Sequence, residues 1–257
     1  METAYKWPEG EKIVYIRPPH EVYEGKLGNF YDPKCFPELQ IIRDNWEGIR
    51  DEIFEYENRN GLLRGVSSYT PPENTENLWT NLYLMNYLWK FHKNRKKLPF
   101  TTSLIEQIPN CTYATVSILP GMTDIYPHFG DTNVIMRSHI GLLIPKPYPT
   151  IAIKVGQDEV GWEDGGMICF PISNEHSVWN RSSERRYILI VDIVPEIHKH
   201  MRFAICSRAL GNQSFIFFYK KFKFVQEFPN FVHEVMISIA TLMWRIYLPI
   251  QRNLKFL

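Results

Sequence analysis

A series of short, strand-like segments, separated by turn-forming residues, constrains the fold of this chain more than any other feature. After Thr112, glycine, proline, aspartate and asparagine interrupt the apolar runs at regular intervals, and these residues favour turns. Strands this short and this evenly spaced predict a β-sandwich or a barrel. The predicted strands are Tyr113–Leu119, Met136–Ile144, Thr150–Val155, Met167–Phe170, Ser177–Asn180 and Tyr187–Val194.

A helical pattern precedes these strands. We expect an amphipathic helix within Pro37–Asn58 that ends near Asn60 and Gly61 and packs on a sheet. Its apolar positions follow helical spacing, with charged residues between them: Ile42, Trp46, Ile49 and Ile53.

The segments between this helix and the strands are less regular. Ser67–Asn77 is rich in polar residues and proline and predicts a loop, whereas the sequence leaves the type of the aromatic segment Leu78–Phe91 open. The basic run Lys93–Lys97 is typical of a solvated turn, with contact to phosphate or a membrane as the alternative. A short helix is expected at Thr102–Gln107.

The chain divides into three regions that differ in their helix-like and strand-like sequence patterns. We expect an N-terminal helical and loop region at 1–110 that packs on the core, a β-rich catalytic core at 111–196, and a helical C-terminal extension at 197–257. Within the extension, Val235–Trp244 is uncharged, but Glu234 and Arg245 bracket it. This leaves it well short of the roughly 20 residues of a membrane span, so it is expected to be buried or to lie on a membrane surface.

Composition excludes several classes of protein. With 257 residues, 44% of them hydrophobic and 22% charged, the chain is globular rather than disordered. A net charge of +1 creates no field that would attract nucleic acid, so anion recognition should be local. The first thirty residues carry charges throughout, which argues against a secretory signal and for a cytoplasmic location. Four widely spaced cysteines without a CxxC pair indicate reduced thiols.

Strand alternation brings polar residues together. Side chains two residues apart share a face, so Arg137 and His139 point the same way, as do Arg186 and Asp192 on the last strand. If these faces line one barrel, the convergent set is His128, His176, Ser117, Arg137, His139 and Arg186. Buried cations require anionic partners, and a bound dicarboxylate would supply them.

These residue types suit a non-haem iron centre. Neutral imidazoles bind Fe(II) and can leave coordination positions open, and the planar fork of arginine holds a carboxylate with two hydrogen bonds. Each residue also has a structural explanation, since a single strand histidine is more often a packed residue and Arg186 could be a surface neighbour of Arg185. The combination, rather than any member, carries the hypothesis.

Several spaced motifs resemble one known family. They are Ser117-x-Leu119-Pro120-Gly121, Pro127-His128-Phe129-Gly130-x-Thr132-Asn133, Arg137-x-His139-x-Gly141-Leu142, Trp162-x-Asp164-Gly165 and Glu175-His176-x-Val178-Trp179, with Arg186 ten residues after His176. In this order they resemble the aspartyl/asparaginyl β-hydroxylase family over Ile108–Pro195. Phe36–Asp51 and Lys97–Pro109 also resemble segments that precede its catalytic core.

The resemblance implies a double-stranded β-helix, a jelly-roll of the cupin kind, that uses Fe(II), 2-oxoglutarate and O2. His128 and His176 match the iron ligands, Ser117 and Arg186 match residues that hold the distal carboxylate of 2-oxoglutarate, and His139 matches one near its oxo-acid end. Arg137 matches a residue that contacts a carboxylate of the substrate or of the cosubstrate, and the sequence does not decide between them.

The chain departs from most 2-oxoglutarate oxygenases at one position. Those enzymes carry an iron-binding carboxylate two residues after the first histidine, where this chain has Gly130. The departure is similar to the animal aspartyl hydroxylases, and Asp131 is a weak substitute because it is one residue out of phase. By the same resemblance, Trp162–Gly165 is expected to be a structural turn, and Trp179 and Asn180 are expected to pack the barrel.

The resemblance implies hydroxylation of an unactivated carbon, the β-carbon of an aspartyl or asparaginyl residue in a peptide or a related small substrate. One alternative is a lipid acyl-chain hydroxylase that contacts a membrane peripherally through the C-terminal extension, although Gly130 favours the aspartyl type. Another is a non-catalytic binding module with the same fold. The loops Ser67–Asn77 and Lys146–Pro149 are the candidates for substrate selection.

Overall fold

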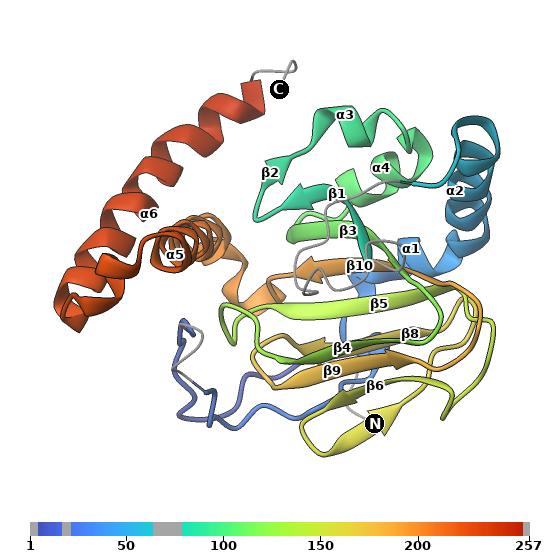
Figure 1. The fold of residues 1–257 in the computed structure, drawn as a ribbon, viewed down its shortest axis with the longest axis horizontal. Helices are drawn as coiled ribbons and strands as arrows, with labels where there is room; N and C mark the ends of the chain where they lie inside the picture. Colours follow the sequence, from blue (N-terminus) through green and yellow to red (C-terminus); the bar gives the residue numbers. More distant parts are fainter. Residues whose placement is uncertain (1–4, 17–21, 64–78, 254–257) are drawn as a thin grey trace.

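The computed structural model describes residues 5–16, 22–63 and 79–253 and consists of two stacked antiparallel sheets flanked by helices (Figure 1). The loop expected at Ser67–Asn77 lies outside the described residues. In the view of Figure 1, α2 and α6 lie on opposite sides of the molecule, and β4, β5, β6, β8 and β9 lie in its lower half.

Eight strands form the core. They are β3 (Cys111–Leu119), β4 (Thr123–His128), β5 (Met136–Leu143), β6 (Ile151–Val155), β7 (Asp158–Val160), β8 (Met167–Pro171), β9 (His176–Asn180) and β10 (Arg186–Ile193). One sheet contains β3-β10-β5-β8 and the other β4-β9-β6-β7. The chain therefore crosses repeatedly between two antiparallel sheets, which is the topology of a double-stranded β-helix. The predicted fold class is confirmed.

Two further strands extend the first sheet. β1 (Thr80–Asn86) pairs antiparallel with β3, and β2 (Trp89–Lys90) pairs with β1 at the edge. The residues between them, Tyr87 and Leu88, both have positive φ, as a tight hairpin turn requires. The aromatic segment whose type the sequence left open is therefore mostly strand.

Each of the six predicted strands overlaps an observed strand, but two strands of the core were missed. β4 carries exposed residues and Pro127, and β7 has only three residues, Asp158–Val160. Proline and charged residues lower the strand signal of a sequence. Pairing with β9 and β6, rather than local preference, holds these two strands in the sheet.

The single helix expected within Pro37–Asn58 is interrupted. The segment forms short 3-10 turns at Pro33–Cys35 and Pro37–Leu39, then α1 (Gln40–Asp44) and α2 (Trp46–Asn60). Asn45 separates the two helices, because its side-chain amide donates to the Ile41 carbonyl and its φ is −115°. α2 ends before Gly61, whose φ of 77° stops the helix, and packs against β5 as expected.

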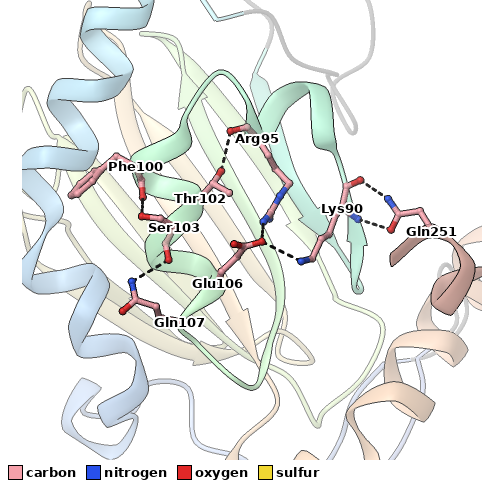
Figure 2. Close-up of polar contacts among 8 residues, drawn as sticks. All are labelled: Lys90, Arg95, Phe100, Thr102, Ser103, Glu106, Gln107 and Gln251. Carbon is pink, nitrogen blue, oxygen red and sulfur yellow. Dashed lines mark hydrogen bonds and ion pairs between the residues drawn. The ribbon is translucent and has the colours of Figure 1, made fainter. Parts of the chain in front are cut away.

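The basic run Lys93–Lys97 is not simply a solvated turn. It lies partly in α3 (His92–Arg95), and the Arg95 side chain is buried. Figure 2 shows Arg95 and Lys90 both paired with Glu106 of α4 (Pro99–Glu106). The prediction was wrong for Arg95 because a carboxylate distant in sequence lies across the turn. The helix expected at Thr102–Gln107 corresponds to α4.

Four helical segments form the C-terminal extension. These are a 3-10 segment at Glu196–Met201, α5 (Arg202–Lys221), a 3-10 segment at Lys223–Glu227, and α6 (Asn230–Asn253). α6 continues through Glu234 and Arg245, so the expectation of a short apolar segment was wrong. The stretch Asn230–Gln251 is long and apolar enough to cross a membrane by length and composition alone. The division of the chain at 110 and 196 stays a prediction.

Two apolar clusters organise the core. One lies between the outer face of the larger sheet and the helices, and includes Ile49, Ile53, Val116 and Leu189. The other fills the space between the two sheets and includes Leu119, Phe170 and Ile188. The inward faces of β3, β5 and β10 are therefore the faces predicted from strand alternation.

Glu52 is expected to stabilise the junction of α2 and α4. Its carboxylate accepts hydrogen bonds from the backbone N–H groups of Phe100 and Thr101 at 2.7 and 2.8 Å, which caps the start of α4. Removing such a cap costs about 1 kcal/mol, so Glu52→Ala should lower the free energy of unfolding in urea by about that amount. Glu55→Ala, an exposed neighbour on α2, should change it by less than about 0.5 kcal/mol. Equal effects of the two variants would contradict the capping role.

Candidate metal and anion site

Two histidines lie next to each other on neighbouring strands of the smaller sheet. His128 ends β4, His176 begins β9, and the two residues are register partners with ring centroids 4.1 Å apart. The predicted pair is therefore brought together by antiparallel pairing, although the residues are far apart in sequence.

Hydrogen bonds set the same tautomer on both rings. The Nδ1 atom of each histidine lies 2.8 Å from the backbone carbonyl oxygen two residues earlier, that of Tyr126 or Asn174. A carbonyl can only accept, so each Nδ1 carries the hydrogen and each Nε2 carries the lone pair. Burial lowers the pKa of both rings, and that of His176 lies well below its usual value. Two neutral imidazoles with fixed Nε2 lone pairs are suited to bind a metal.

The third position beside the histidines has no room for a carboxylate. A Cβ atom on Gly130 would lie 2.6 Å from the side chain of Ile172, which is itself buried. Asp131 does not replace it, because its carboxylate accepts hydrogen bonds from Tyr87 at 2.6 Å and Gln213 at 3.3 Å. Within the described ranges, no three His, Cys, Asp or Glu residues form a group that could hold a metal. The site is a pair of histidines.

Arg186 places a buried positive charge in the barrel interior, near Ser117, Trp162 and His139. Its side chain is 1% exposed, and its Nη2 lies 3.5 Å from the Ser117 Oγ. Its Nε has no hydrogen-bond partner among the described residues. Burial lowers the pKa of Arg186 to about 9, and no carboxylate of the described residues offsets this effect. Among these residues, the guanidinium lacks the anion that a buried arginine requires.

Aromatic rings surround the guanidinium. Arg186 lies 5.0 Å above the ring of Trp162, and Trp79 donates its Nε1 hydrogen to Ser117 Oγ at 2.8 Å. Trp162 is 2% exposed, and its own Nε1 has no partner in the described part of the chain. The residues around Arg186 thus combine a cation, a hydroxyl and, among the described residues, an unused indole donor next to apolar side chains.

His139 also lies next to Trp162. Its ring stacks on Trp162 at 5.8 Å and meets Phe170 edge-on at 5.0 Å. Burial holds its pKa well below the usual value, and the charges of Arg137 and Arg186 lower the pKa further, so the ring is neutral. Neither ring nitrogen has a partner among the residues described. His139 can therefore donate to, or accept from, a ligand.

Arg137 differs from Arg186 because the protein supplies its anion. Its Nε and Nη2 donate to the two carboxylate oxygens of Asp192 at 2.8 and 2.7 Å. Burial alone would lower the pKa of Arg137, but Asp192 raises it above the usual value. The expectation that bound dicarboxylate neutralises both arginines was wrong for Arg137, because Asp192 lies opposite it in the β5–β10 register.

Three pocket residues were missed or misassigned from the sequence. Trp162, expected only in a structural turn, lines the pocket, and Trp79 belongs to the segment whose type was open. Asn81 lies opposite Ser117 in the β1–β3 register, and both of its buried amide atoms lack partners among the described residues. The aromatic composition of the Leu78–Phe91 segment was the available signal for Trp79. Strand alternation could have placed Asn81 only once β1 was paired with β3.

The residues expected to pack the barrel have structural contacts. Asn180 donates to the carbonyl oxygens of Leu119, Pro120 and Glu184 and closes the turn before β10. Trp179 donates to the carbonyl oxygen of Pro149, which ties the loop Lys146–Pro149 to β9.

Comparison with known proteins agrees with this geometry. Residues 43–195 match the model of the family described as "Aspartyl/Asparaginyl beta-hydroxylase". The chain belongs to the aspartyl/asparaginyl β-hydroxylase family. Its members are hydroxylases that act on carbon.

The names of two curated relatives specify different substrates. The chain is 30% identical to the ornithine lipid ester-linked acyl 2-hydroxylase of Rhizobium tropici, over 77% of this chain and 69% of the relative. It is 31% identical to the human aspartyl/asparaginyl beta-hydroxylase, over 78% of this chain but only 28% of the human protein. The family thus includes both a lipid hydroxylase and an enzyme named for amino-acid residues.

Among solved structures, the chain is similar to AviO1 of Streptomyces viridochromogenes, with 13% identity, a TM-score of 0.40, and coverage of 66% of this chain and 88% of that one. The cupin domain of Schizosaccharomyces pombe Cnp3 aligns with 16% identity and a TM-score of 0.29, over 37% of this chain and 63% of that one.

Replacement of each arginine by methionine should change the free energy of unfolding in opposite directions. Arg137→Met leaves the buried Asp192 carboxylate without its partner and should lower the free energy of unfolding in urea by about 3–5 kcal/mol. Arg186→Met removes a buried cation without a carboxylate partner and should leave the stability unchanged or raise it, by about 1 kcal/mol or more. Similar losses in the two ligand-free variants would contradict the assignment of an unneutralised charge to Arg186.

Gly130 should tolerate no side chain unless Ile172 is shortened. Gly130→Ala overpacks the contact and should lower the free energy of unfolding by about 1–3 kcal/mol. Gly130→Ala in an Ile172→Gly background, which also removes the Cβ atom of residue 172, should cost less than in the native background, and a double-mutant cycle measures this coupling. Gly28→Ala is the matched control, because its Cβ would meet nothing closer than 3.8 Å. Additive effects at 130 and 172 would contradict the steric account.

Proposed function

We propose that this chain is a dioxygenase that uses Fe(II), 2-oxoglutarate and O2 to hydroxylate an unactivated carbon. The observation that carries the proposal is the buried Arg186 guanidinium, which has no carboxylate partner among the described residues and lies in the same barrel as the paired histidines. A dicarboxylate bound in the barrel would supply the missing negative charge.

The two histidines fit the proposed metal. His128 and His176 would hold iron through Nε2, since their Nδ1 atoms are engaged by backbone carbonyls. Imidazole nitrogens suit Fe(II), and two protein ligands leave positions for a chelating oxo acid and for O2. When bound, iron supplies the activation of O2 that is coupled to conversion of 2-oxoglutarate to succinate and CO2.

The protein residues would position the two ends of 2-oxoglutarate. Arg186 and Ser117 would bind the distal carboxylate, with the Trp79 indole fixing the orientation of the Ser117 hydroxyl. His139 would contact the oxo-acid end. Trp162 and Phe170 exclude water from this region, which strengthens each of these contacts.

Arg137 would act at the substrate side of the site. Its Nε and Nη2 are engaged by Asp192, so Nη1 is the atom that would contact a carboxylate or carbonyl of the substrate or cosubstrate. The ion pair holds the guanidinium plane at one angle, which orients that contact.

The names of the two relatives suggest a common chemical target. The β-carbon of an aspartyl or asparaginyl residue and C2 of an ester-linked acyl chain are both methylene carbons bonded to a carbonyl carbon. We propose that the substrate of this chain presents such a methylene. The first candidate is an aspartyl or asparaginyl residue in a peptide or a related small molecule. The second is a lipid acyl chain, which the exposed apolar face of α6 favours.

Turnover of 2-oxoglutarate tests the cofactor assignment. Succinate formation is measured with purified protein, Fe(II) and 2-oxoglutarate, with candidate substrate present. His128→Ala should abolish it, and Arg186→Met should raise the KM for 2-oxoglutarate by about a hundredfold, the loss of a charge-assisted hydrogen-bonded pair. Arg185→Met is the matched control at the exposed neighbouring position and should behave as the native protein.

Two outcomes would overturn this assignment. Unchanged succinate formation in His128→Ala would remove the iron site from the two histidines. Tight binding of 2-oxoglutarate without succinate formation under any substrate would instead indicate a binding module with the same fold.

The two substrate candidates are separated by mass spectrometry in the same reaction. A gain of one oxygen on Asp- or Asn-containing peptides, matched by succinate, supports the first candidate. The same gain on an ester-linked acyl lipid supports the second. Succinate that forms without oxygen transfer to either class contradicts the proposed methylene target.

A further inference from the structure

α6 exposes a long row of large apolar side chains in addition to the apolar residues that it buries. The stripe that faces the protein includes His233, Thr241 and Gln251 together with Ile237 and Leu248. The outer face carries large apolar side chains: Val235, Ile239, Leu242, Met243, Ile246 and Ile250. A helix exposed to water places its apolar stripe toward the core, so the outer face of α6 is adapted to an apolar surrounding.

The size of this face makes a chance exposure a poor explanation. The exposed apolar residues run from Val235 to Ile250, which corresponds to a length of about 24 Å along α6. Ile239 is 57% exposed, Met243 65% and Ile246 61%. An apolar surface that follows a helix for this length marks an interaction site.

The tip of the α5–α6 hairpin combines aromatic and basic residues. Six phenylalanines are exposed there, and neighbouring rings contact one another: Phe217, Phe218, Phe222, Phe224, Phe228 and Phe231. Lys220, Lys221 and Lys223 lie between them in sequence. Residues 202–253 contain seven Lys and Arg but two Asp and Glu, whereas the whole chain has a net charge of only +1. The positive charge is therefore concentrated next to the apolar face.

We propose that the outer face of α6, together with the hairpin tip, docks on an anionic membrane surface, with α6 lying in the plane of the bilayer. Basic residues beside an apolar helical face complement anionic headgroups and the acyl boundary at once. A second copy of the chain fits less well, because its equivalent face would bring like charges together. The proposal rests on this surface alone and not on the proposed reaction.

The inner face of α6 explains why the helix lies on the bilayer and does not span it. It packs on α5, where a Cβ on Gly211 would meet Thr241 at 2.3 Å, so the two helices touch closely. Trp89 stacks on Tyr247 at 5.4 Å, and its ring also meets Trp244. A spanning helix would have to lose these contacts.

A second anchor fixes the end of α6 to the barrel. Figure 2 shows Gln251 bonded to both backbone groups of Lys90, donating at 2.7 Å and accepting at 3.4 Å. The Lys90 side chain in turn pairs with Glu106 at 3.2 Å. Because β2 and β1 continue the barrel sheet, docking of α6 would set the orientation of the barrel relative to the membrane.

Vesicle flotation tests the proposal, with the full chain and without iron or 2-oxoglutarate. We expect binding to vesicles of phosphatidylcholine mixed with phosphatidylglycerol. Ile239→Glu should weaken the binding about tenfold or more, the value of one buried apolar side chain. Leu62→Glu is the matched control, since Leu62 is similarly exposed at 53% and directly follows α2, on the opposite side of the molecule from α6 in Figure 1.

A variant without the lysines of the hairpin tip measures the electrostatic contribution to vesicle binding. The triple variant Lys220→Gln, Lys221→Gln, Lys223→Gln should bind the mixed vesicles about fivefold more weakly per lysine. It should bind pure phosphatidylcholine vesicles as the native chain does. All three variants should keep the far-ultraviolet circular dichroism of the native chain, and their 2-oxoglutarate turnover with a soluble substrate should be unchanged.

Three results would overturn the proposal. The first is equal vesicle binding by Ile239→Glu and Leu62→Glu. The second is a dimer, seen by light scattering, that Ile239→Glu dissociates while the native chain fails to float, which would assign the face to a second copy. The third is resistance of the bound chain to extraction at alkaline pH, which would indicate a spanning helix.

Discussion

The buried charge of Arg186 is the main constraint on the barrel interior, because a buried cation requires an anion. It lies on β10, in the middle of the larger sheet, where no carboxylate of the described residues neutralises it. Asp192 faces the same interior from the other end of β10, but Arg137 engages both of its oxygens. One arginine is thus part of the folded structure, and the other is left for a ligand. In the proposed function, this asymmetry would give the site a direction, with a ligand carboxylate at Arg186 and the metal at the histidine pair.

The histidine pair depends on the backbone in the same way. In both β4 and β9, the carbonyl two residues earlier holds Nδ1, so both rings present Nε2. Ile172 fills the space in which a third protein ligand would otherwise lie. The barrel therefore permits two histidines and excludes a carboxylate at position 130 by packing. In the proposed reaction, the remaining metal positions would be left to the oxo acid and O2.

The helical extension is attached to the barrel sheet. α6 exposes large apolar side chains on its outer face, and its inner face contacts β2 through Trp89 and Lys90. The relatives include a lipid hydroxylase and an enzyme named for amino-acid residues, so their substrates differ in whether they lie in a membrane or in water. If α6 docks on a membrane, its attachment to the barrel would fix the orientation of the site relative to that membrane.

Strand alternation predicted much of this structure. Because side chains on a strand alternate with period two and one face is buried, the placement of Ser117, His139 and Arg186 on an inward face followed from local sequence. The strands β4 and β7 did not, since their residues prefer other conformations and only pairing with neighbouring strands holds them. The interruption at Asn45 escaped prediction for a similar reason, as a side-chain hydrogen bond there overrides an otherwise helical pattern.

The sequence by itself determined the fold class and most of the polar residues inside the barrel, because strand alternation is a local property, and its motifs indicated the family. Only the tertiary structure decided which of these residues are paired. Arg137 meets Asp192, Trp79 meets Ser117, and Trp162 covers Arg186 through contacts between segments that are distant in the chain. Such pairings depend on the register of one strand against another. Register is fixed by the packing of the whole barrel rather than by any one of its strands.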